Sequence, residues 1–186
     1  MTSEETLKDI KKELRANMNG VASSYMRQRG LSYHVNFGIE LPRLHDIAAQ
    51  YEPDEQIAQQ LWNEDVRESK ILATMLMPTQ QFSPETCDRW ASQIPNAEIA
   101  QMATLNLFSH LPYARQKAFE WMASEERMLQ LCGFLLITRI VIQGTRLTTK
   151  ETERLDILAK AHADTTFFPL RKAIQNASIH IPEQNH

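Results

Sequence analysis

Glycine and proline are scarce in this sequence, with 5 and 8 residues among 186. All-β architectures need many turns, and turns depend heavily on these two residue types. The shortage argues against a sandwich or barrel and favours a helical fold. Because the length lies within the usual range for one domain, we expect a single domain over residues 1–182. A short disordered tail is expected at residues 183–186.

Long apolar runs are also missing. The longest, Leu131 to Ile137, is far shorter than the roughly 20 residues that a membrane-spanning helix needs. The first segment, MTSEETLKDIKKELRANM, is charged and amphipathic and lacks the apolar core and cleavage site of a signal peptide. We therefore expect a soluble protein of the cytoplasm.

Residues that mark metal sites or covalent catalysis are few and scattered. Cys87 and Cys132 fall in segments of helical pattern and have no metal-ligand spacing. The six histidines include no pair spaced to place two ligands on one helical face. No glycine-rich phosphate loop or nucleophile elbow occurs. We expect buried thiols and no metal, and most common enzyme classes are excluded.

An excess of positive charge is lacking too, because 20 lysine and arginine residues face 23 acidic residues. This balance is wrong for a protein that grips nucleic acid over its whole surface, so contact with DNA would need a local basic surface. The C-terminal third is the more basic part, although a solvated charged face explains its charges equally well. Arg139 could instead leave the core at a helix edge. The candidate DNA contacts are Arg139, Arg146, Lys150, Arg171 and Lys172.

The sequence does contain a repeat of amphipathic segments. Trp62, Trp90 and Trp121 recur 28 and 31 residues apart, each near the end of one segment and shortly before another. Such aromatic side chains could stack on bases, but packing between helices is the favoured interpretation. Apolar residues recur at helical intervals, which predicts helix, short turn, helix in each unit. The three units span residues 54–77, 83–108 and 114–141.

Local signals mark the ends of several predicted helices. Ser83, Pro84 and Glu85 place a capping hydroxyl, a first-turn proline and a first-turn acid in order. Similar starts occur at Leu41-Pro42 and at Pro53-Asp54-Glu55. Two further helices are expected at about 148–163 and 166–177, with Gly144 near the break before them.

Two segments carry a resemblance to a known family. VNFGIELPRLHDIAAQY (35–51) and LWNEDVRESKILATML (61–76) are similar to successive motifs of the bacterial DNA alkylation repair family, and a patchier likeness continues to about residue 177. The resemblance implies an all-α fold, an α-α superhelix or solenoid of stacked HEAT-like antiparallel helix pairs. It also implies a concave face that holds duplex DNA, DNA glycosylase activity on alkylated purines, and no metal or organic cofactor.

The residues that active members use for catalysis are replaced here. Those members place a tryptophan and, four residues later, an aspartate in the cleft, and the resemblance puts these positions on Asn96 and Ala100. A second cleft tryptophan falls on Asn176, and a DNA-contacting arginine falls on Leu131. Without a carboxylate to stabilise the cationic sugar of the transition state, base excision in the family's usual manner is not expected. Glu98, about half a helical turn from the acid position, is a weak catalytic candidate.

Three hypotheses about function follow from these observations. The leading one is a DNA alkylation repair family protein that binds duplex DNA, intact or damaged, through its concave face. The alternative is a non-catalytic helical-repeat module that binds a protein or peptide, which the acidic net charge and the lost cleft residues would suit. The third is a working glycosylase with rearranged catalytic groups such as Glu98. The sequence leaves open whether the protein is an enzyme.

Overall fold

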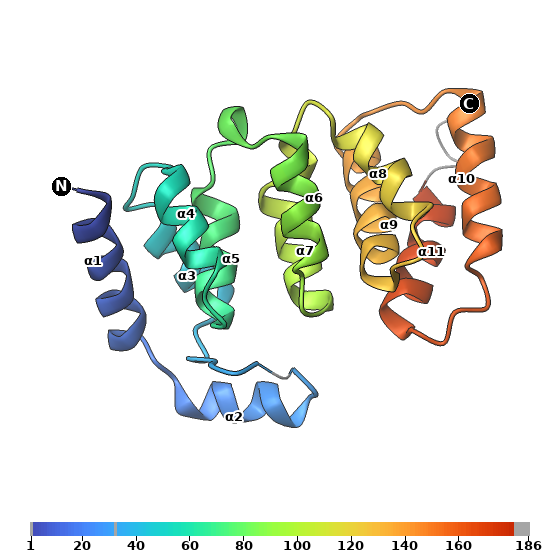
Figure 1. The fold of residues 1–186 in the computed structure, drawn as a ribbon. Helices are drawn as coiled ribbons and strands as arrows, with labels where there is room; N and C mark the ends of the chain where they lie inside the picture. The colour runs from blue at the N-terminus through green and yellow to red at the C-terminus, as the bar shows by residue number, and fades with distance from the viewer. Residues whose placement is uncertain (1, 32, 181–186) are drawn as a thin grey trace. The chain divides into compact units, whose positions relative to one another are not determined.

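The structure of the chain, a computed structural model, describes residues 2–31 and 33–180. Within these residues it consists of eleven α-helices and two short 3-10 helices (Figure 1). The all-α prediction is therefore confirmed. The helices fall into two compact units, Met1–Phe82 and Ser83–His186. The single domain expected over 1–182 stays a prediction, and the expected tail at 183–186 lies outside the described residues.

The first unit holds five α-helices, of which α4 and α5 are the first predicted helix pair. Asp54 caps α4 by accepting a hydrogen bond from the backbone N–H of Ile57 at 2.8 Å, as its position before the helix predicted. α5 contacts α3 as well as α4, and α1 contacts α4. The helices are α1 (Ser3–Ala16), α2 (Gly20–Gln28), α3 (Leu41–Ala48), α4 (Glu55–Trp62) and α5 (Arg67–Leu76), followed by a 3-10 helix at Thr79–Gln81.

A buried ion pair on α5 holds the loop that precedes α3. The Arg67 guanidinium donates to a Glu68 carboxylate oxygen at 3.0 Å, and both side chains are almost fully buried. The Glu68 carboxylate accepts the backbone N–H groups of Phe37 at 3.0 Å and Ile39 at 3.2 Å. Arg67 donates to the carbonyl oxygen of Ile39 at 2.9 Å. We call these residues the clasp. They satisfy backbone groups that would otherwise be buried without partners.

Gly38 lies inside the loop that the clasp holds. Its φ of 72° is in the left-handed region, which favours glycine. A Cβ atom at this position would also lie 2.2 Å from the carbonyl oxygen of Asn19 and 2.5 Å from the backbone nitrogen of Ser23. Glycine at this position of the first family-like motif therefore allows the loop to pack closely against the start of α2.

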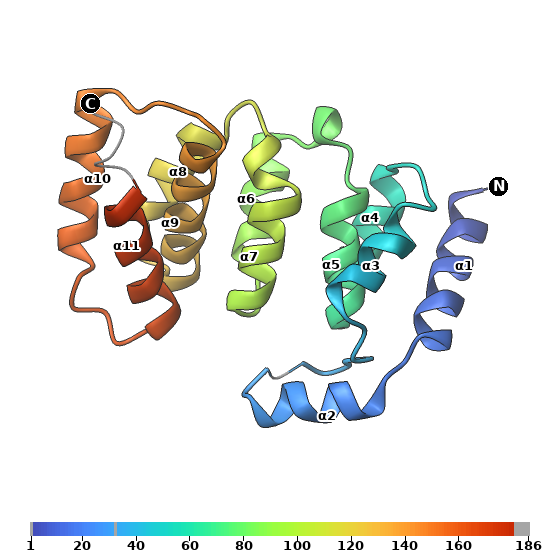
Figure 2. The ribbon, with the colours of Figure 1, turned by 180° about the vertical axis from the view of Figure 1, so that it is seen from behind.

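The second unit is built around α9. This helix contacts α6, α7, α8 and α11, and both views of the ribbon show it between α7 and α11 (Figures 1 and 2). The predicted pairs at 83–108 and 114–141 are confirmed, and the two later helices are present with slightly shifted ends. The helices are α6 (Pro84–Ser92), α7 (Ala97–Asn106), α8 (Ala114–Met122), α9 (Arg127–Ile142), α10 (Thr149–Ala161) and α11 (Phe168–His180), with a 3-10 helix at Phe108–His110.

The helix signals of the second unit act as expected. Ser83 caps α6 by accepting the backbone N–H of Thr86, and Pro84 occupies the first turn. Thr148 and Glu151 form a reciprocal capping box at the start of α10. Gly144, with φ of 101°, follows the end of α9. These local interactions explain why the helix starts could be placed from the sequence alone.

The three repeated tryptophans are packing residues. Trp62, Trp90 and Trp121 are at most 3% exposed, and each lies in the first helix of its pair. The indole N–H of Trp121 donates to the Asp88 carboxylate at 2.9 Å, so its polar group is satisfied on folding. Exposed platforms for base stacking are excluded for these residues, and the packing interpretation is confirmed.

Two helices of the second unit approach closely at Gly133 of α9. A Cβ atom there would lie 2.6 Å from the backbone nitrogen of Met122 and 2.7 Å from the carbonyl oxygen of Ala118. Both atoms belong to the backbone of α8. The absence of a side chain at residue 133 therefore sets how closely α8 and α9 pack.

Both cysteines are buried free thiols. Burial raises the pKa of Cys132 to about 12 and raises that of Cys87 as well. A buried thiol that stays protonated is a poor nucleophile, which agrees with a packing role for both residues. No helix in the described part of the chain is both long and apolar enough to cross a membrane.

Candidate functional site

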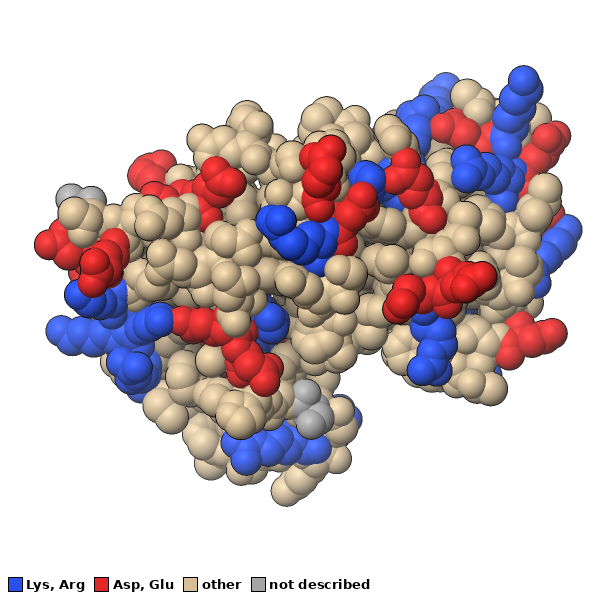
Figure 3. Space-filling model, in the orientation of Figure 1, with Lys and Arg blue, Asp and Glu red and all other residues tan. Residues whose placement is uncertain are grey.

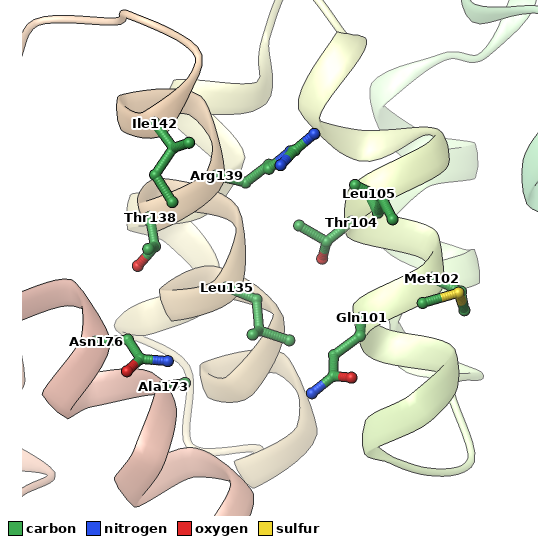
Figure 4. Close-up of a pocket in the computed structure, with 10 residues that line it drawn as sticks. All are labelled: Gln101, Met102, Thr104, Leu105, Leu135, Thr138, Arg139, Ile142, Ala173 and Asn176. Carbon is green, nitrogen blue, oxygen red and sulfur yellow. The ribbon is translucent and has the colours of Figure 1, made fainter. Parts of the chain in front are cut away.

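A pocket of about 290 Å³ opens in the second unit where α7, α9 and α11 come together (Figure 4). Most of its wall is apolar. On α7 and α9 the lining positions recur three and four residues apart, so each helix presents one face to it. The lining consists of Gln101, Met102, Thr104 and Leu105 from α7, Leu135, Thr138, Arg139 and Ile142 from α9, and Ala173 and Asn176 from α11.

Two polar atoms at the pocket are buried and lack a hydrogen-bond partner among the described residues. They are Nε of Arg139 and Oγ1 of Thr104. Thr104 is only 3% exposed, and Figure 4 shows both side chains extending into the space between α9 and α7. A buried polar atom without a hydrogen-bond partner lowers the stability of the folded protein by about 1–3 kcal/mol. These two atoms are therefore candidates for hydrogen bonds to a ligand or to water.

The electrostatic character of the pocket follows from its lining. Arg139 is the charged residue among the ten that line it, and none of the ten is aspartate or glutamate. The amide side chains of Gln101 and Asn176 supply further donors and acceptors. The pocket is therefore weakly basic, with apolar walls and hydrogen-bond donors on two facing helices.

The structure separates the residues at which the resemblance places the cleft. Asn176 lines the pocket. Asn96 instead caps α7, with its side-chain oxygen accepting the backbone N–H of Ile99 at 3.1 Å. Ala100 and Leu131 are buried at 0% and 1% exposure, so neither can contact a bound molecule. The catalytic assignment of these positions stays a prediction.

On α7, the residues that face the pocket lie one position later in the sequence than the residues that the resemblance places in the cleft. The positions four residues apart on this face are Ala97 and Gln101, because Gln101 lines the pocket and Ala97 lies one turn before it. Glu98 is on the same side, one turn before Gln101, and is partly exposed. Neither alignment places a tryptophan and an aspartate at the pocket.

Some of the predicted DNA-contacting residues lie at the pocket, and others lie away from it. Arg139 lines the pocket, and Lys172 lies four residues before Asn176, hence on the same side of α11. Arg171 is exposed, with its guanidinium carbon 5.6 Å from the ring centre of Phe168. Arg146 and Lys150 are exposed and lie outside the pocket lining.

On the face of the molecule drawn in Figure 3, basic and acidic side chains occur together. Figure 3 shows acidic and basic side chains interspersed over α10, and elsewhere on the visible face both signs are also present. In α10 itself, Lys160 pairs with Asp156. The charges on this face therefore do not by themselves identify a DNA-binding surface.

Sequence reasoning missed three polar residues of the pocket, Gln101, Thr104 and Thr138. A threonine within an apolar helix is a weak signal, because its hydroxyl often bonds to the backbone of its own helix. Thr138 does so, donating to the Phe134 carbonyl oxygen at 2.8 Å. Thr104 does not, and only the structure reveals the difference.

No arrangement of three or more histidine, cysteine or acidic side chains suited to a metal ion is found within residues 2–31 and 33–180. The candidate site is formed by the side chains that line the pocket. Its chemistry consists of one guanidinium, two hydroxyls, two amides and an apolar wall. These groups can bind and orient a ligand by hydrogen bonding, and the lining provides no carboxylate for general acid or base catalysis.

Comparison with known proteins places the chain in a family. A solved structure described as "a new family of proteins related to the HEAT-like repeat DNA glycosylases with affinity for branched DNA structures" matches with a TM-score of 0.81 and 16% identity, covering 92% of this chain and 73% of that one. This likeness confirms the HEAT-like helical-repeat fold. No curated protein matches the chain. The model of the DNA alkylation repair enzyme family matches residues 10–178, and the chain therefore belongs to that family.

Proposed function

We propose that this protein binds DNA, preferring branched DNA to intact duplex, through the side of the second unit on which the pocket opens. Family membership and the HEAT-like fold support DNA as the partner. The structurally similar protein is described as having affinity for branched DNA, which supports this class of substrate. We identify the side formed by α7, α9 and α11 with the concave, DNA-facing side that the family resemblance implies.

The observation that carries the proposal is a pocket with an unsatisfied arginine and no acidic lining residue. A guanidinium attracts the anionic DNA backbone and the acceptor atoms of bases. It would oppose the cationic sugar that develops when a glycosidic bond breaks, because charges of the same sign repel in a site of low dielectric. The groups around Arg139 thus suit binding better than base release.

DNA binding can be tested by fluorescence anisotropy with labelled four-way junction, flap, intact duplex and duplex with an abasic-site analogue. We expect micromolar or tighter binding to branched DNA, about tenfold tighter than to intact duplex. The logarithm of the affinity should fall with the logarithm of the salt concentration, by about 0.9 for each phosphate contacted. No binding at low salt to any of these DNAs would contradict the proposal and favour the protein-binding or peptide-binding module.

The role of the basic residues on α11 can be tested in the same assay. The double variant Arg171→Glu/Lys172→Glu should weaken binding by at least about tenfold and reduce the salt slope by about 2. The matched control is Arg89→Glu/Lys160→Glu, which makes the same change of charge at exposed sites on α6 and α10. If both double variants weaken binding equally, general electrostatic attraction explains the result and the α11 surface has no special role.

Base excision gives a second prediction. The wild-type protein is expected to release no methylated purine from alkylated DNA above the spontaneous rate, because no lining residue supplies a carboxylate. Release can be measured by chromatography of the free bases. Release that disappears in Glu98→Gln would instead support a rearranged glycosylase that uses the predicted weak candidate. Release that persists in that variant would remove Glu98 and still contradict the expected inactivity.

A further inference from the structure

We infer that the pocket between α7, α9 and α11 receives a single unpaired nucleobase, with Arg139 and Thr104 donating hydrogen bonds to its edge. The inference rests on the proposed DNA binding and names the part of the DNA that the pocket recognises. It assigns a ligand to two buried donor atoms that the fold leaves without partners among the described residues.

The size and walls of the pocket suit one planar ring system. Its volume of about 290 Å³ lies just below the range of about 300–1,000 Å³ found for small-molecule sites. Leu105 and Leu135 present apolar side chains from facing helices (Figure 4). Such walls can cover the faces of a base.

The donors suit the edge of a base. Nucleobases carry ring nitrogen and carbonyl acceptors, and arginine commonly pairs with such acceptors. The side chains of Arg139 and Thr104 extend into the space between α9 and α7 (Figure 4), and Nε of Arg139 and Oγ1 of Thr104 are buried without a hydrogen-bond partner in the described part of the chain. Gln101 and Asn176 at the pocket can donate or accept, as the exocyclic groups of a base require.

A backbone phosphate is a poorer match than a base. Phosphate keeps a full negative charge, and moving it from water to a largely apolar site is costly unless several donors or cations surround it. Here one guanidinium faces mainly aliphatic side chains. A neutral ring with two or three acceptors satisfies the same donors with less desolvation.

The inference supplies a physical reason for a preference for branched DNA. In intact duplex every base is stacked and paired, and extruding one costs a few kcal/mol. Junctions, flaps and bulges contain bases that are less completely stacked or paired, so moving such a base out of the helix costs less free energy. A pocket that accepts one base therefore discriminates between DNA structures without reading a long sequence.

The test uses a duplex with a single-base bulge in which the unpaired base is 2-aminopurine. On binding, we expect a several-fold rise in its fluorescence, because the base leaves the stack and none of the ten lining residues is aromatic. The same bulge with an abasic residue at the unpaired position should bind about tenfold more weakly. A bound complex with unchanged fluorescence and equal affinity for the two bulges would overturn the inference.

Two variants probe the donors. Arg139→Met and Thr104→Val should each reduce the affinity difference between the base-containing and abasic bulges several-fold. Thr104→Val removes a hydroxyl that has no partner in the unbound protein, so its thermal stability should be unchanged or higher. This combination separates recognition of the base from a structural role. Arg89→Met on α6 makes the same chemical change as Arg139→Met at an exposed site and should keep the difference.

The outcomes also separate this inference from the proposed function. Failure of the wild-type protein to bind any bulged, branched or duplex DNA would remove both. Salt-dependent binding that Arg139→Met weakens equally for the two bulges would identify a phosphate contact. DNA binding would then stand, and the base pocket would be wrong.

Discussion

Replacing Gly133 by alanine is expected to lower the free energy of unfolding by about 2 kcal/mol or more. The new methyl group would lie 2.6 Å from the Met122 backbone nitrogen and 2.7 Å from the Ala118 carbonyl oxygen. Backbone atoms cannot turn aside as a flexible side chain can, so α8 and α9 would have to move apart. Alanine is the better helix former by about 1 kcal/mol, which offsets only part of this cost. Urea denaturation followed by circular dichroism measures the loss.

Gly20→Ala provides the matched control for this prediction. Gly20 is the first residue of α2, and a Cβ atom there would meet nothing within 4 Å. The same substitution should therefore leave stability unchanged or raise it by up to about 1 kcal/mol. Equal stability of Gly133→Ala and the wild-type protein would show that α8 and α9 are not held at the distance described above.

Truncation of Glu68 is expected to have the largest effect on stability. Glu68→Ala would remove the fully buried carboxylate that forms the ion pair with Arg67 and would leave the backbone N–H groups of Phe37 and Ile39 without that acceptor. Removing one partner of a buried ion pair costs about 3–5 kcal/mol. The denaturation midpoint of the first unit should fall accordingly, as followed by hydrogen exchange of amides in α3 and α5.

A surface pair in the same unit serves as the reference for Glu68. Glu4 pairs with Lys8 at 2.8 Å, but the two side chains are 77% and 71% exposed, and Glu4→Ala should have no measurable effect on unfolding. Glu68→Gln keeps the shape and should be less harmful than Glu68→Ala. If Glu68→Ala unfolds at the wild-type urea concentration, the clasp does not stabilise the first unit.

The helices could be predicted because the signals that define them are local. Asp54 and Ser83 act as caps in the structure, and the three tryptophans lie in the first helices of successive pairs. Capping and apolar periodicity involve residues within one or two turns. They need no knowledge of what the helix packs against.

The pocket could be predicted only in part because it depends on how helices are rotated about their axes. Asn176 and Arg139 were identified, but on α7 the resemblance pointed to Ala100, whereas Gln101 faces the pocket. A shift of one residue turns a side chain by about 100° on a helix. That rotation is set by contacts of α9 with α7 and α11, which come from segments well separated in the sequence.

Arg139 illustrates the same limit. Its position in an apolar run allowed both a helix-edge residue and a residue facing a ligand. The structure places it in the pocket lining with a buried, unpaired Nε. The sequence could not reveal that Thr104, 35 positions earlier, lies across from it with an unpaired hydroxyl. The two side chains form a candidate binding site because both lie at the same pocket.

The clasp changes what a family signature can tell about a protein. Gly38, Arg67 and Glu68 carry much of the likeness to the family, yet all of them maintain a loop and a helix within the first unit. None of them lines the pocket, which belongs to the second unit. A family signature composed of such residues indicates the fold and does not indicate which reaction or ligand the protein has. Proteins that share these residues can therefore share the fold and still differ in function.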